Sequence, residues 1–359
     1  MNLPKPIKFE VERYVGGLSQ FKKIENPIKL SANESALGAS PKAIEAFEKE
    51  KNKLFKYPED DSNSLREVLS NEFKIDPKRI ICGSGSDQIF DLTCRLFLNP
   101  GDEVIVTEFG FIMYKIYASL SRAKIVLAKE KNFKASVEEI IKKVSDKTKI
   151  VFIANPNNPT GTYLSKNEML DLRKKLRSDI LLVVDDAYFE FIDSDNFSSG
   201  LDLFEDSANV LITRTFSKIY GLAGLRLGWG YSSKEIIDSM YQIKPPFNVN
   251  RAVLAAGMAA IQDSEWTKKA IDHNALWSKK IFSMLKEYNI KTNEPAVNFF
   301  LMNFDETKIN SDEAFEKLAA DKLIVRKMTQ YKIPNSLRLT IGNKEANENF
   351  IKSMGSILK

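Results

Sequence analysis

The stretch Ile180-Leu181-Leu182-Val183-Val184-Asp185-Asp186-Ala187-Tyr188 combines the most hydrophobic of the predicted strands with two carboxylates at its end. A run that is apolar on both faces is typical of a strand covered by helices on both sides of a parallel sheet. An unpaired carboxylate buried at the end of such a strand is costly, so we expect Asp185 to have a cationic partner. A surface turn is the alternative, but the apolar run before Asp185 makes it the poorer account.

Short β-rich runs of this kind alternate with helical patterns between about residues 78 and 231, which is the sequence form of βαβ units. The predicted strands are residues 79–82, 103–106, 149–153, 180–184, 209–212 and 226–230. The predicted helices of this region are residues 87–97, 137–144, 166–176 and 235–242.

The pattern changes after the pair Pro245-Pro246, which is a natural domain boundary. Beyond it we predict helices at 249–262, 264–288 and 345–358 and strands at 299–304 and 337–341. We therefore expect an α/β protein whose large domain, residues 45–246, has a mostly parallel sheet covered by helices on both faces. Residues 247–359 are predicted to form a smaller α+β domain. Residues 1–44 are predicted to be an N-terminal arm that packs on the small domain or on a partner subunit.

Length and composition agree with this division and exclude several kinds of protein. The 359 residues suffice for two cores, since single cores stop growing near roughly 250–300 residues. The net charge of +5, from 53 Lys and Arg against 48 Asp and Glu, is scattered and argues against nucleic acid as a partner. The first residues lack the apolar core of a secretory signal, and no apolar run approaches the ~20 residues needed to cross a membrane. We expect a soluble, cytoplasmic protein.

Cysteine and histidine are too scarce for several kinds of site. Cys82 and Cys94 are too few for a disulfide framework or a zinc site, and we interpret them as buried structural thiols. His273 is the single histidine and lies in a long amphipathic stretch, so we expect it on a solvated helix face. A histidine base, or a metal site built on histidine, is therefore not expected.

Three loops that follow predicted strands carry the candidate chemistry, because ligands collect at the carboxyl ends of strands in open α/β sheets. Gly83-Ser84-Gly85-Ser86-Asp87 could cradle a phosphate with its backbone amides, or could equally be a capped turn. In Asn155-Pro156-Asn157-Asn158-Pro159-Thr160-Gly161 the prolines favour a rigid loop that presents Asn158, although a structural turn is the alternative. Thr215-Phe216-Ser217-Lys218 places an amine in a loop, with Arg226 eight residues further on.

Taken together, the motifs Gly-Ser-Asp, Asn-Asn-Pro-Thr-Gly, Asp-x-Ala-Tyr and Ser-Lys-x-x-Gly-Leu-Ala-Gly-Leu-Arg resemble those of the fold-type I pyridoxal-phosphate aminotransferases. Within that group the chain is most similar to the histidinol-phosphate aminotransferases, a resemblance that runs from about Leu30 to Gly342. The segment Pro245-Pro246-Phe247-Asn248-Val249-Asn250 also resembles that subfamily.

The resemblance implies a role for each motif residue in binding pyridoxal 5′-phosphate. Lys218 would carry the cofactor as a Schiff base and shuttle the proton between the substrate α-carbon and C4′ of the cofactor. Asp185 would pair with the pyridinium nitrogen. The remaining cofactor-binding residues implied are Asn158 and Tyr188 at the phenolic oxygen, Phe111 stacked on the ring, and Ser217, Arg226 and the loop Gly85, Ser86 and Asp87 at the phosphate.

The resemblance further implies a homodimer with a shared active site and small-molecule substrates. Tyr57, in Lys56-Tyr57-Pro58-Glu59, would reach the phosphate from the neighbouring subunit. Arg338, Arg326 and Asn158 would bind the substrate, the arginines clamping its anionic group. Two departures bear on this: Glu108-Phe109-Gly110 lacks the proline usual before Phe111, and residues 32–38 differ from the form usual in the family.

Three functions follow from the resemblance as hypotheses. The first is transamination between an amino donor resembling L-histidinol phosphate, or an aromatic L-amino acid, and 2-oxoglutarate. The second is pyridoxal-phosphate-dependent decarboxylation of a phosphorylated amino acid. The third is a non-catalytic cofactor-binding regulator, which the presence of Lys218 with Asp185 disfavours.

Overall fold

The computed structural model describes residues 4–9, 11–18 and 24–358, and its centre is a seven-stranded sheet. The strand order is β2-β10-β9-β8-β7-β3-β4, and β10 runs antiparallel to both of its neighbours in an otherwise parallel arrangement. The strands are β2 (Ile80–Gly83), β3 (Glu103–Thr107), β4 (Lys124–Ala128), β7 (Thr148–Ala154), β8 (Leu181–Asp185), β9 (Val210–Thr215) and β10 (Gly228–Tyr231). The mostly parallel sheet predicted from the sequence is confirmed.

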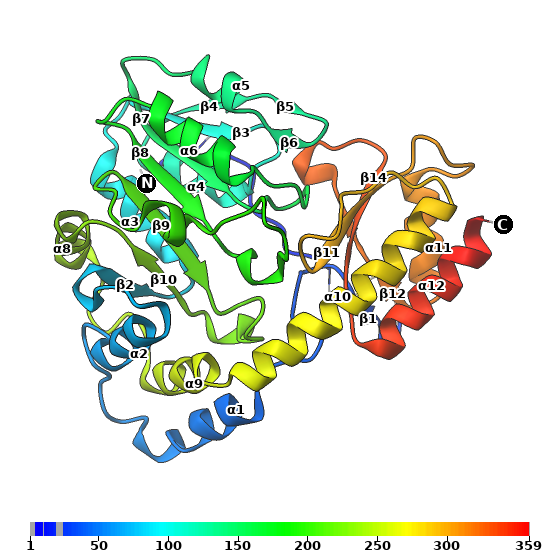
Figure 1. Ribbon diagram of the computed structural model, residues 1–359, viewed down its shortest axis with the longest axis horizontal. Coiled ribbons are helices and arrows are strands. Elements are labelled where there is room, and N and C mark those ends of the chain that lie inside the picture. Colours follow the sequence, from blue (N-terminus) through cyan, green and yellow to red (C-terminus); the bar gives the residue numbers. More distant parts are fainter. Residues whose placement is uncertain (1–3, 10, 19–23, 359) are drawn as a thin grey trace.

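Both faces of this sheet are buried. Successive side chains of a strand point to opposite faces, and each face packs into its own hydrophobic cluster. In β8, Leu182 and Val184 belong to one hydrophobic cluster, and Leu181 and Val183 belong to the other. Helices lie over both faces (Figure 1). The helices of this part of the chain are α1 (Pro41–Glu48), α2 (Asn63–Phe73), α3 (Ser86–Phe97), α4 (Ile112–Leu120), α5 (Val137–Ile141), α6 (Lys166–Lys175), α7 (Gly200–Phe204), α8 (Lys234–Ile243) and α9 (Arg251–Ile261), of which α1 packs on α9. We call this sheet with its helices the large module.

A second, smaller body, which we call the small module, lies beside the large module and has its own core (Figure 1). Its strands are β1 (Ile28–Lys29), β11 (Phe299–Asn303), β12 (Leu323–Ile324), β13 (Arg326–Lys327) and β14 (Ser336–Thr340). Its helices are α10 (Ser264–Glu287), α11 (Ser311–Ala320) and α12 (Lys344–Leu358). β11, β14 and β13 form an antiparallel sheet, and β1 pairs in parallel with β12. The α+β character predicted for this part of the sequence agrees with these elements.

The junction between the two modules follows α9. Hydrophobic residues of α9, among them Val253 and Ala256, belong to the core of the large module. Helix α9 packs against α1 and α2, and α10 then runs from α9 to the small module (Figure 1). We therefore propose that the domain boundary, predicted at Pro245-Pro246, lies near Asp263.

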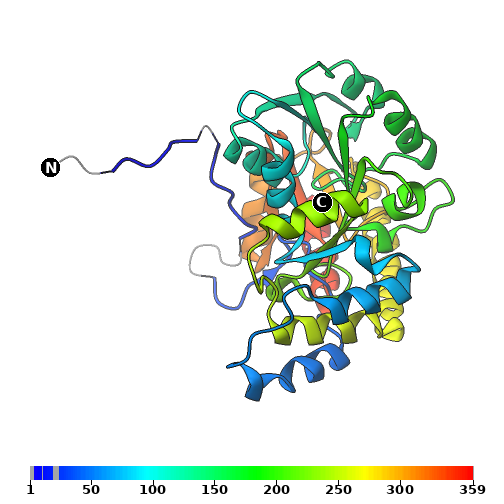
Figure 2. The same cartoon turned by 90° about the vertical axis from the view of Figure 1, so that its left-hand side faces the viewer.

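The N-terminal segment contacts the small module over part of its length. Residues 4–9 extend away from the body (Figure 2). Further along, the Val15 backbone NH donates to Gln330 Oε1 at 3.3 Å, and Leu18 O accepts from Ser31 Oγ at 2.6 Å. The segment then enters the small module as β1, whose neighbour Leu30 is buried in its core. These contacts tie residues 11–18 and 24–30 to the small module.

Smaller elements complete the chain. The hairpin β5 (Glu130–Lys131) and β6 (Lys134–Ala135) follows β4, and short 3-10 turns lie at Lys51–Lys53, Pro77–Arg79, Phe189–Phe191, Ala223–Leu225 and Thr329–Tyr331. Cys82 and Cys94 are free and buried, which agrees with their interpretation as structural thiols. His273 lies part-buried on helix α10, and its Nε2 lies 2.9 Å from Gly342 O. No helix within the described part of the chain has the length and apolarity needed to cross a membrane.

Candidate active site

The predicted site residues meet in one cavity of about 500 Å³ at the carboxyl ends of the parallel strands. Segments that follow β2, β3, β7, β8 and β9 converge there with β13, β14 and the N-terminal segment. Of the thirteen residues predicted for the site, eleven line the cavity: Ser86, Asp87, Phe111, Asn158, Asp185, Tyr188, Ser217, Lys218, Arg226, Arg326 and Arg338. The cavity therefore lies where the two modules meet.

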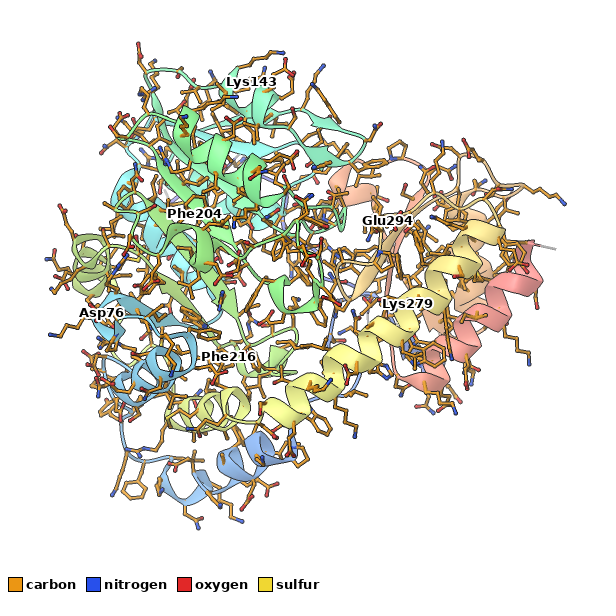
Figure 3. The ribbon with its side chains drawn as sticks, viewed as in Figure 1. Asp76, Lys143, Phe204, Phe216, Lys279 and Glu294 are labelled. Carbon is orange, nitrogen blue, oxygen red and sulfur yellow. The ribbon has the colours of Figure 1, made fainter. Side chains whose placement is uncertain are left out.

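Lys218 is held by a loop that is anchored in the core immediately before it. Phe216 is fully buried within the large module (Figure 3), and a Cβ added to Gly257 of α9 would lie 3.6 Å from its ring. The Ser217 NH donates to Thr215 Oγ1 at 3.1 Å, and the Gly221 NH donates to Lys218 O at 3.0 Å. These bonds fix the backbone while leaving the side chain free to enter the cavity.

The amine of Lys218 is poised to lose its proton. Burial, followed in effect by the nearby charge of Arg338, lowers its pKa to about 8. Within the described part of the chain Nζ makes no hydrogen bond, and it lies 5.5 Å from the centroid of the Tyr188 ring. An amine with a pKa this low is substantially neutral near pH 8 and can act as a nucleophile or a base.

Asp185 ends β8 and is almost completely buried. Tyr114 Oη donates to its Oδ2 at 2.6 Å, and Thr213 Oγ1 donates to Oδ1 at 3.3 Å. Burial raises the pKa of Asp185 to about 6, and the Tyr114 hydroxyl opposes that rise. Among the described residues no Lys or Arg forms an ion pair with Asp185, so its cationic partner stays a prediction.

Two hydrogen bonds connect the large-module loops to the small module. Asn33 Nδ2 donates to Tyr188 Oη at 2.9 Å, and Asn33 in turn accepts from Thr340 Oγ1 at 3.1 Å. Arg338 donates to Asn158 Oδ1 through one nitrogen and to Ser31 O at 3.0 Å through another. Burial raises the pKa of Tyr188 to about 12, so its hydroxyl remains protonated and can donate a hydrogen bond.

Backbone hydrogen bonds close the loop that presents Asn158, for which the sequence predicts a rigid turn. The Asn157 NH donates to Thr162 O at 2.8 Å, and the Gly161 NH donates to Asn157 O at 2.8 Å. Gly161 has a φ of +71°, a conformation that glycine adopts without strain. The side chain of Asn158 is thereby directed at Arg338 and the cavity.

The other end of the cavity is built from the start of α3 and from Arg226. Helix α3 begins at Ser86, so its first backbone NH groups are available to an anion. Arg226 donates to Asp87 Oδ2 at 3.0 Å and to Ser217 Oγ at 3.3 Å. Gly85 does not line the cavity, but a Cβ added to it would approach Arg226 Nη2 to 2.5 Å, so its lack of a side chain leaves room for the guanidinium.

Arg326 lies under the N-terminal segment. Its Nη2 donates to Val15 O at 2.8 Å, and its guanidinium lies 5.5 Å from the centroid of the Tyr14 ring. Tyr14 in turn makes an edge contact with Phe111, with the ring centroids 6.5 Å apart. Phe111 therefore lies at the cavity as predicted, without a proline before it.

Tyr57 does not reach the cavity of its own chain. Its side chain is 77% exposed and stacks on Phe247, with the ring centroids 4.5 Å apart. Leu54 and Phe55 beside it are 78% and 82% exposed. A role for Tyr57 in the site therefore requires a second copy of the chain.

Four contributors were missed from the sequence. Tyr114, Thr213, Asn33 and Tyr14 contact predicted site residues or line the cavity. Thr213 and Asn33 lie close in the sequence to predicted site segments, which is a usable signal. Tyr114 lies on a helix and Tyr14 in the arm, and neither follows a recognisable motif.

A larger cleft of about 690 Å³ lies elsewhere between the modules, lined by residues such as Asn132, Thr160 and Asn293. None of the thirteen predicted site residues lines it. Size alone therefore does not identify the active site, and we assign the site by its chemistry.

Comparison with known proteins identifies the family. The family model described as aminotransferase class I and II matches residues 25–354. A histidinol-phosphate aminotransferase of Pelagibacter ubique (strain HTCC1062) is 50% identical over 358 residues, which cover 99% of this chain and 99% of that protein. A histidinol-phosphate aminotransferase of Maricaulis maris (strain MCS10) is 39% identical over 357 residues, again covering 99% of each.

Solved structures show the same fold. The crystal structure of histidinol-phosphate aminotransferase from Sinorhizobium meliloti in complex with pyridoxal-5′-phosphate has a TM-score of 0.84 at 22% identity. The match covers 92% of this chain and 90% of that chain. The predicted fold class is therefore confirmed.

Proposed function

The chain belongs to the class I and II aminotransferases, and we propose that it transfers the amino group of a donor resembling L-histidinol phosphate to 2-oxoglutarate, with pyridoxal 5′-phosphate as cofactor. The observation that carries the proposal is the low-pKa amine of Lys218 in the same cavity as Asp185, Arg326 and Arg338. The two relatives named for histidinol phosphate support this donor. An aromatic L-amino acid is the other donor considered.

The residues of the cavity fit pyridoxal phosphate. Its aldehyde requires an amine, which Lys218 supplies without an existing hydrogen-bond partner among the described residues. Its ring nitrogen carries a positive charge when protonated, and the buried carboxylate of Asp185 has no cation of its own. Its phosphate requires donors, which the start of α3, Ser217 and Arg226 provide.

When bound, pyridoxal phosphate supplies an aldehyde that condenses with amines and a ring that withdraws electrons from the substrate α-carbon. With the cofactor bound, Lys218 would be the base of the reaction, and its Nζ would accept and release the proton that leaves the α-carbon. Its pKa of about 8 lets the amine both accept and release a proton near neutral pH. No histidine is needed for this step.

The groups around Lys218 tune and orient the cofactor. Asp185 would hold the proton on the ring nitrogen through a buried ion pair, which favours electron withdrawal at the α-carbon. Asn158 and Tyr188 would donate to the phenolic oxygen. Phe111 would cover the ring, and Arg226 would pair with the phosphate.

Arg338 and Arg326 bind the anionic groups of the donor and of the acceptor. The guanidinium of Arg338 is buried, and its Nε has no hydrogen-bond partner among the described residues. A carboxylate or phosphate would satisfy that donor, because the planar fork of arginine suits both anions. Arg326 and Tyr14 line the adjoining wall, where the second carboxylate of 2-oxoglutarate would lie. Histidinol phosphate carries a single anionic group, its phosphate, which would take the place of one of the two carboxylates.

We further propose a homodimer in which Tyr57 completes the partner's site. The exposed apolar segment of Leu54, Phe55 and Tyr57 supports this proposal, because such patches mark interaction surfaces. A cytoplasmic location is part of the proposal, and cell fractionation would test it. The decarboxylase and regulator hypotheses have no specific observation in their favour.

The reaction is tested by incubating purified, cofactor-loaded enzyme with 2-oxoglutarate and a panel of amino donors. We expect glutamate to form most rapidly with L-histidinol phosphate and more slowly with aromatic amino acids. Glutamate from no donor would refute transamination. Release of carbon dioxide without any need for 2-oxoglutarate would select the decarboxylase instead.

The role of Lys218 is tested separately. Lys218→Ala should abolish turnover and the visible absorbance of the bound cofactor. The one other described lysine that lines the cavity is Lys29, and its amine is already paired with Glu34 at 2.7 Å. Lys175→Ala, at an exposed surface pair, is the control and should match the wild type. Retention of both absorbance and turnover in Lys218→Ala would refute the assignment.

A further inference from the structure

The loop between β3 and α4 carries two aromatic rings. One contacts the small module and the other lines the active-site cavity. Phe109 packs against a cluster formed by Leu301, Met328, Tyr331 and Ile333 of the small module with Ile112 of α4. Two residues further on, Phe111 lines the active-site cavity. The backbone between these two rings therefore sets both the contact with the small module and the position of Phe111.

The residue between the two rings is Gly110, which cannot by itself make this backbone rigid. A Cβ at this position would lie 2.9 Å from Thr107 Oγ1, so a larger side chain does not fit. The Gly110 NH donates to Thr107 O at 3.0 Å, which closes the turn on one side only. Glycine is the most flexible residue, so the turn needs a restraint from outside.

Glu130 of β5 supplies that restraint. Its Oε1 accepts from the Phe109 NH at 3.1 Å, and its own NH donates to Glu108 Oε2 at 3.3 Å. The Glu108 NH also donates to Ala128 O at 2.8 Å. The Glu130 carboxylate thus binds the NH next to Glu108, the Glu108 carboxylate binds the NH of Glu130 itself, and together they attach the loop to the start of the β5–β6 hairpin.

Charged groups surround Glu130 on the neighbouring elements. Burial raises its pKa to about 7, and the carboxylate of Glu108 adds to that rise. Lys115 of α4 opposes the rise and donates to Glu108 O at 3.1 Å. Lys332, near Lys115, is the other cation on this side. A partly buried carboxyl in this setting is costly, so its bond to the loop must compensate for the burial.

We propose that Glu130 is a positioning residue that holds Phe111 against the cofactor by fixing the Phe109 NH. Because Phe109 also packs on the small module, the same bond links the position of the small module to the position of Phe111. The proposal rests on the proposed pyridoxal-phosphate function. Glu130 does not line the cavity and touches no reacting atom. Its effect passes through two peptide units to Phe111.

The test compares Glu130→Ala with Glu130→Gln in the cofactor-loaded enzyme. Alanine removes the acceptor of the Phe109 NH, whereas the glutamine carbonyl retains it. We expect Glu130→Ala to keep its cofactor but to lose visible circular dichroism intensity, which reports the orientation of the bound ring. We also expect kcat to fall about tenfold to 100-fold with little change in KM, because a displacement near 1 Å has effects of this size. Glu130→Gln should recover most of both signals.

Glu138→Ala is the matched control, because Glu138 is exposed and pairs with Lys131 of the same hairpin. It should leave dichroism and kcat unchanged. Wild-type dichroism and kcat in Glu130→Ala would overturn the proposal, as would equal losses in the alanine and glutamine variants. If Glu130→Ala does not fold, Glu130→Gln decides: near wild-type signals support the proposal and altered dichroism overturns it. Absence of a visible cofactor band in the wild type would instead refute the proposed function.

Discussion

At the scale of single residues, the hydroxyl of Tyr114 controls the charge of Asp185. It donates to Oδ2 from the buried side of the carboxylate, and this bond lowers the Asp185 pKa against the effect of burial. The two residues belong to different elements, α4 and β8. The ability of Asp185 to pair with a positive ring nitrogen therefore depends on a side chain outside the recognisable motifs.

Tyr114→Phe should move the acidic limb of the pH profile of kcat/KM to higher pH. Removal of the hydroxyl raises the Asp185 pKa, so the carboxylate is protonated, and its charge lost, at a higher pH as acid is added. The profile of kcat/KM reports groups of the free enzyme. Tyr117→Phe serves as control, because Tyr117 lines the same cavity without a hydrogen bond to Asp185. An unchanged acidic limb in Tyr114→Phe would contradict this role.

At the scale of elements, β8 and β9 place catalytic groups on one face and a buried charge cluster on the other. Asp185 and Thr213 face the cavity side, whereas Asp186 and Arg214 alternate to the opposite side. Arg214 Nε lies 3.8 Å from Asp186 Oδ2, and the guanidinium lies 3.7 Å from the centroid of the Phe189 ring. The Gly200 NH donates to the same carboxylate at 2.8 Å. The cluster locks the ends of both strands.

Arg214→Met should destabilise the protein by about 3–5 kcal/mol, because it leaves a buried carboxylate without its cation. Burial already raises the pKa of Asp186 to about 7 and that of Glu190 to about 8, while Arg214 opposes both shifts. Without Arg214, the burial of Asp186 and Glu190 lowers the free energy of unfolding only when these carboxyls are ionised. The deficit should therefore be largest above pH 8 and shrink as the pH falls below 7 and both groups take up protons.

Denaturant unfolding of the apoenzyme at pH 6 and pH 8.5 measures this loss. Arg95→Met is the control, since Arg95 forms an exposed pair with Asp91 and should contribute only about 0.2–1 kcal/mol. A deficit for Arg214→Met that is equal at both pH values would show that the loss comes from packing rather than from charge.

At the scale of the whole molecule, the proposed shared site makes activity depend on two chains. Lys218 and Asp185 line the cavity of their own chain, whereas Tyr57 is exposed and does not line it. Lys218→Ala and Tyr57→Ala homodimers should each be severely impaired. A hybrid of the two has one site with both Lys218 and the partner-derived tyrosine intact.

Unfolding and refolding the two variants together should therefore restore about a quarter of wild-type activity, because half of randomly paired dimers are hybrids with one complete site. Each variant refolded alone is the control and should stay impaired. If Tyr57 acted within its own chain, no hybrid site would be complete and mixing would restore nothing. Light scattering on the wild type would report a monomer if no dimer forms.

The parallel sheet and the loops that carry Lys218, Asp185 and Asn158 could be predicted from local patterns in the sequence. Alternating apolar strands, prolines and glycines act over a few residues, so their consequences can be predicted locally. Elements with weaker patterns were missed, such as the edge strand β4 and the helices α1, α2, α4 and α11. An edge strand is only partly buried, so its sequence need not be apolar on both faces.

Only the tertiary structure decided which side chains support those loops. The bonds Tyr114–Asp185, Asn33–Tyr188 and Arg338–Asn158 join residues 71, 155 and 180 positions apart. Such pairs form because the packing of the two modules brings strand ends, a helix and a small-module strand to one cavity. No local sequence pattern predicts these long-range contacts. The sequence thus specified the chemistry at the end of each strand, and the tertiary structure specified the charge and geometry in which that chemistry can act.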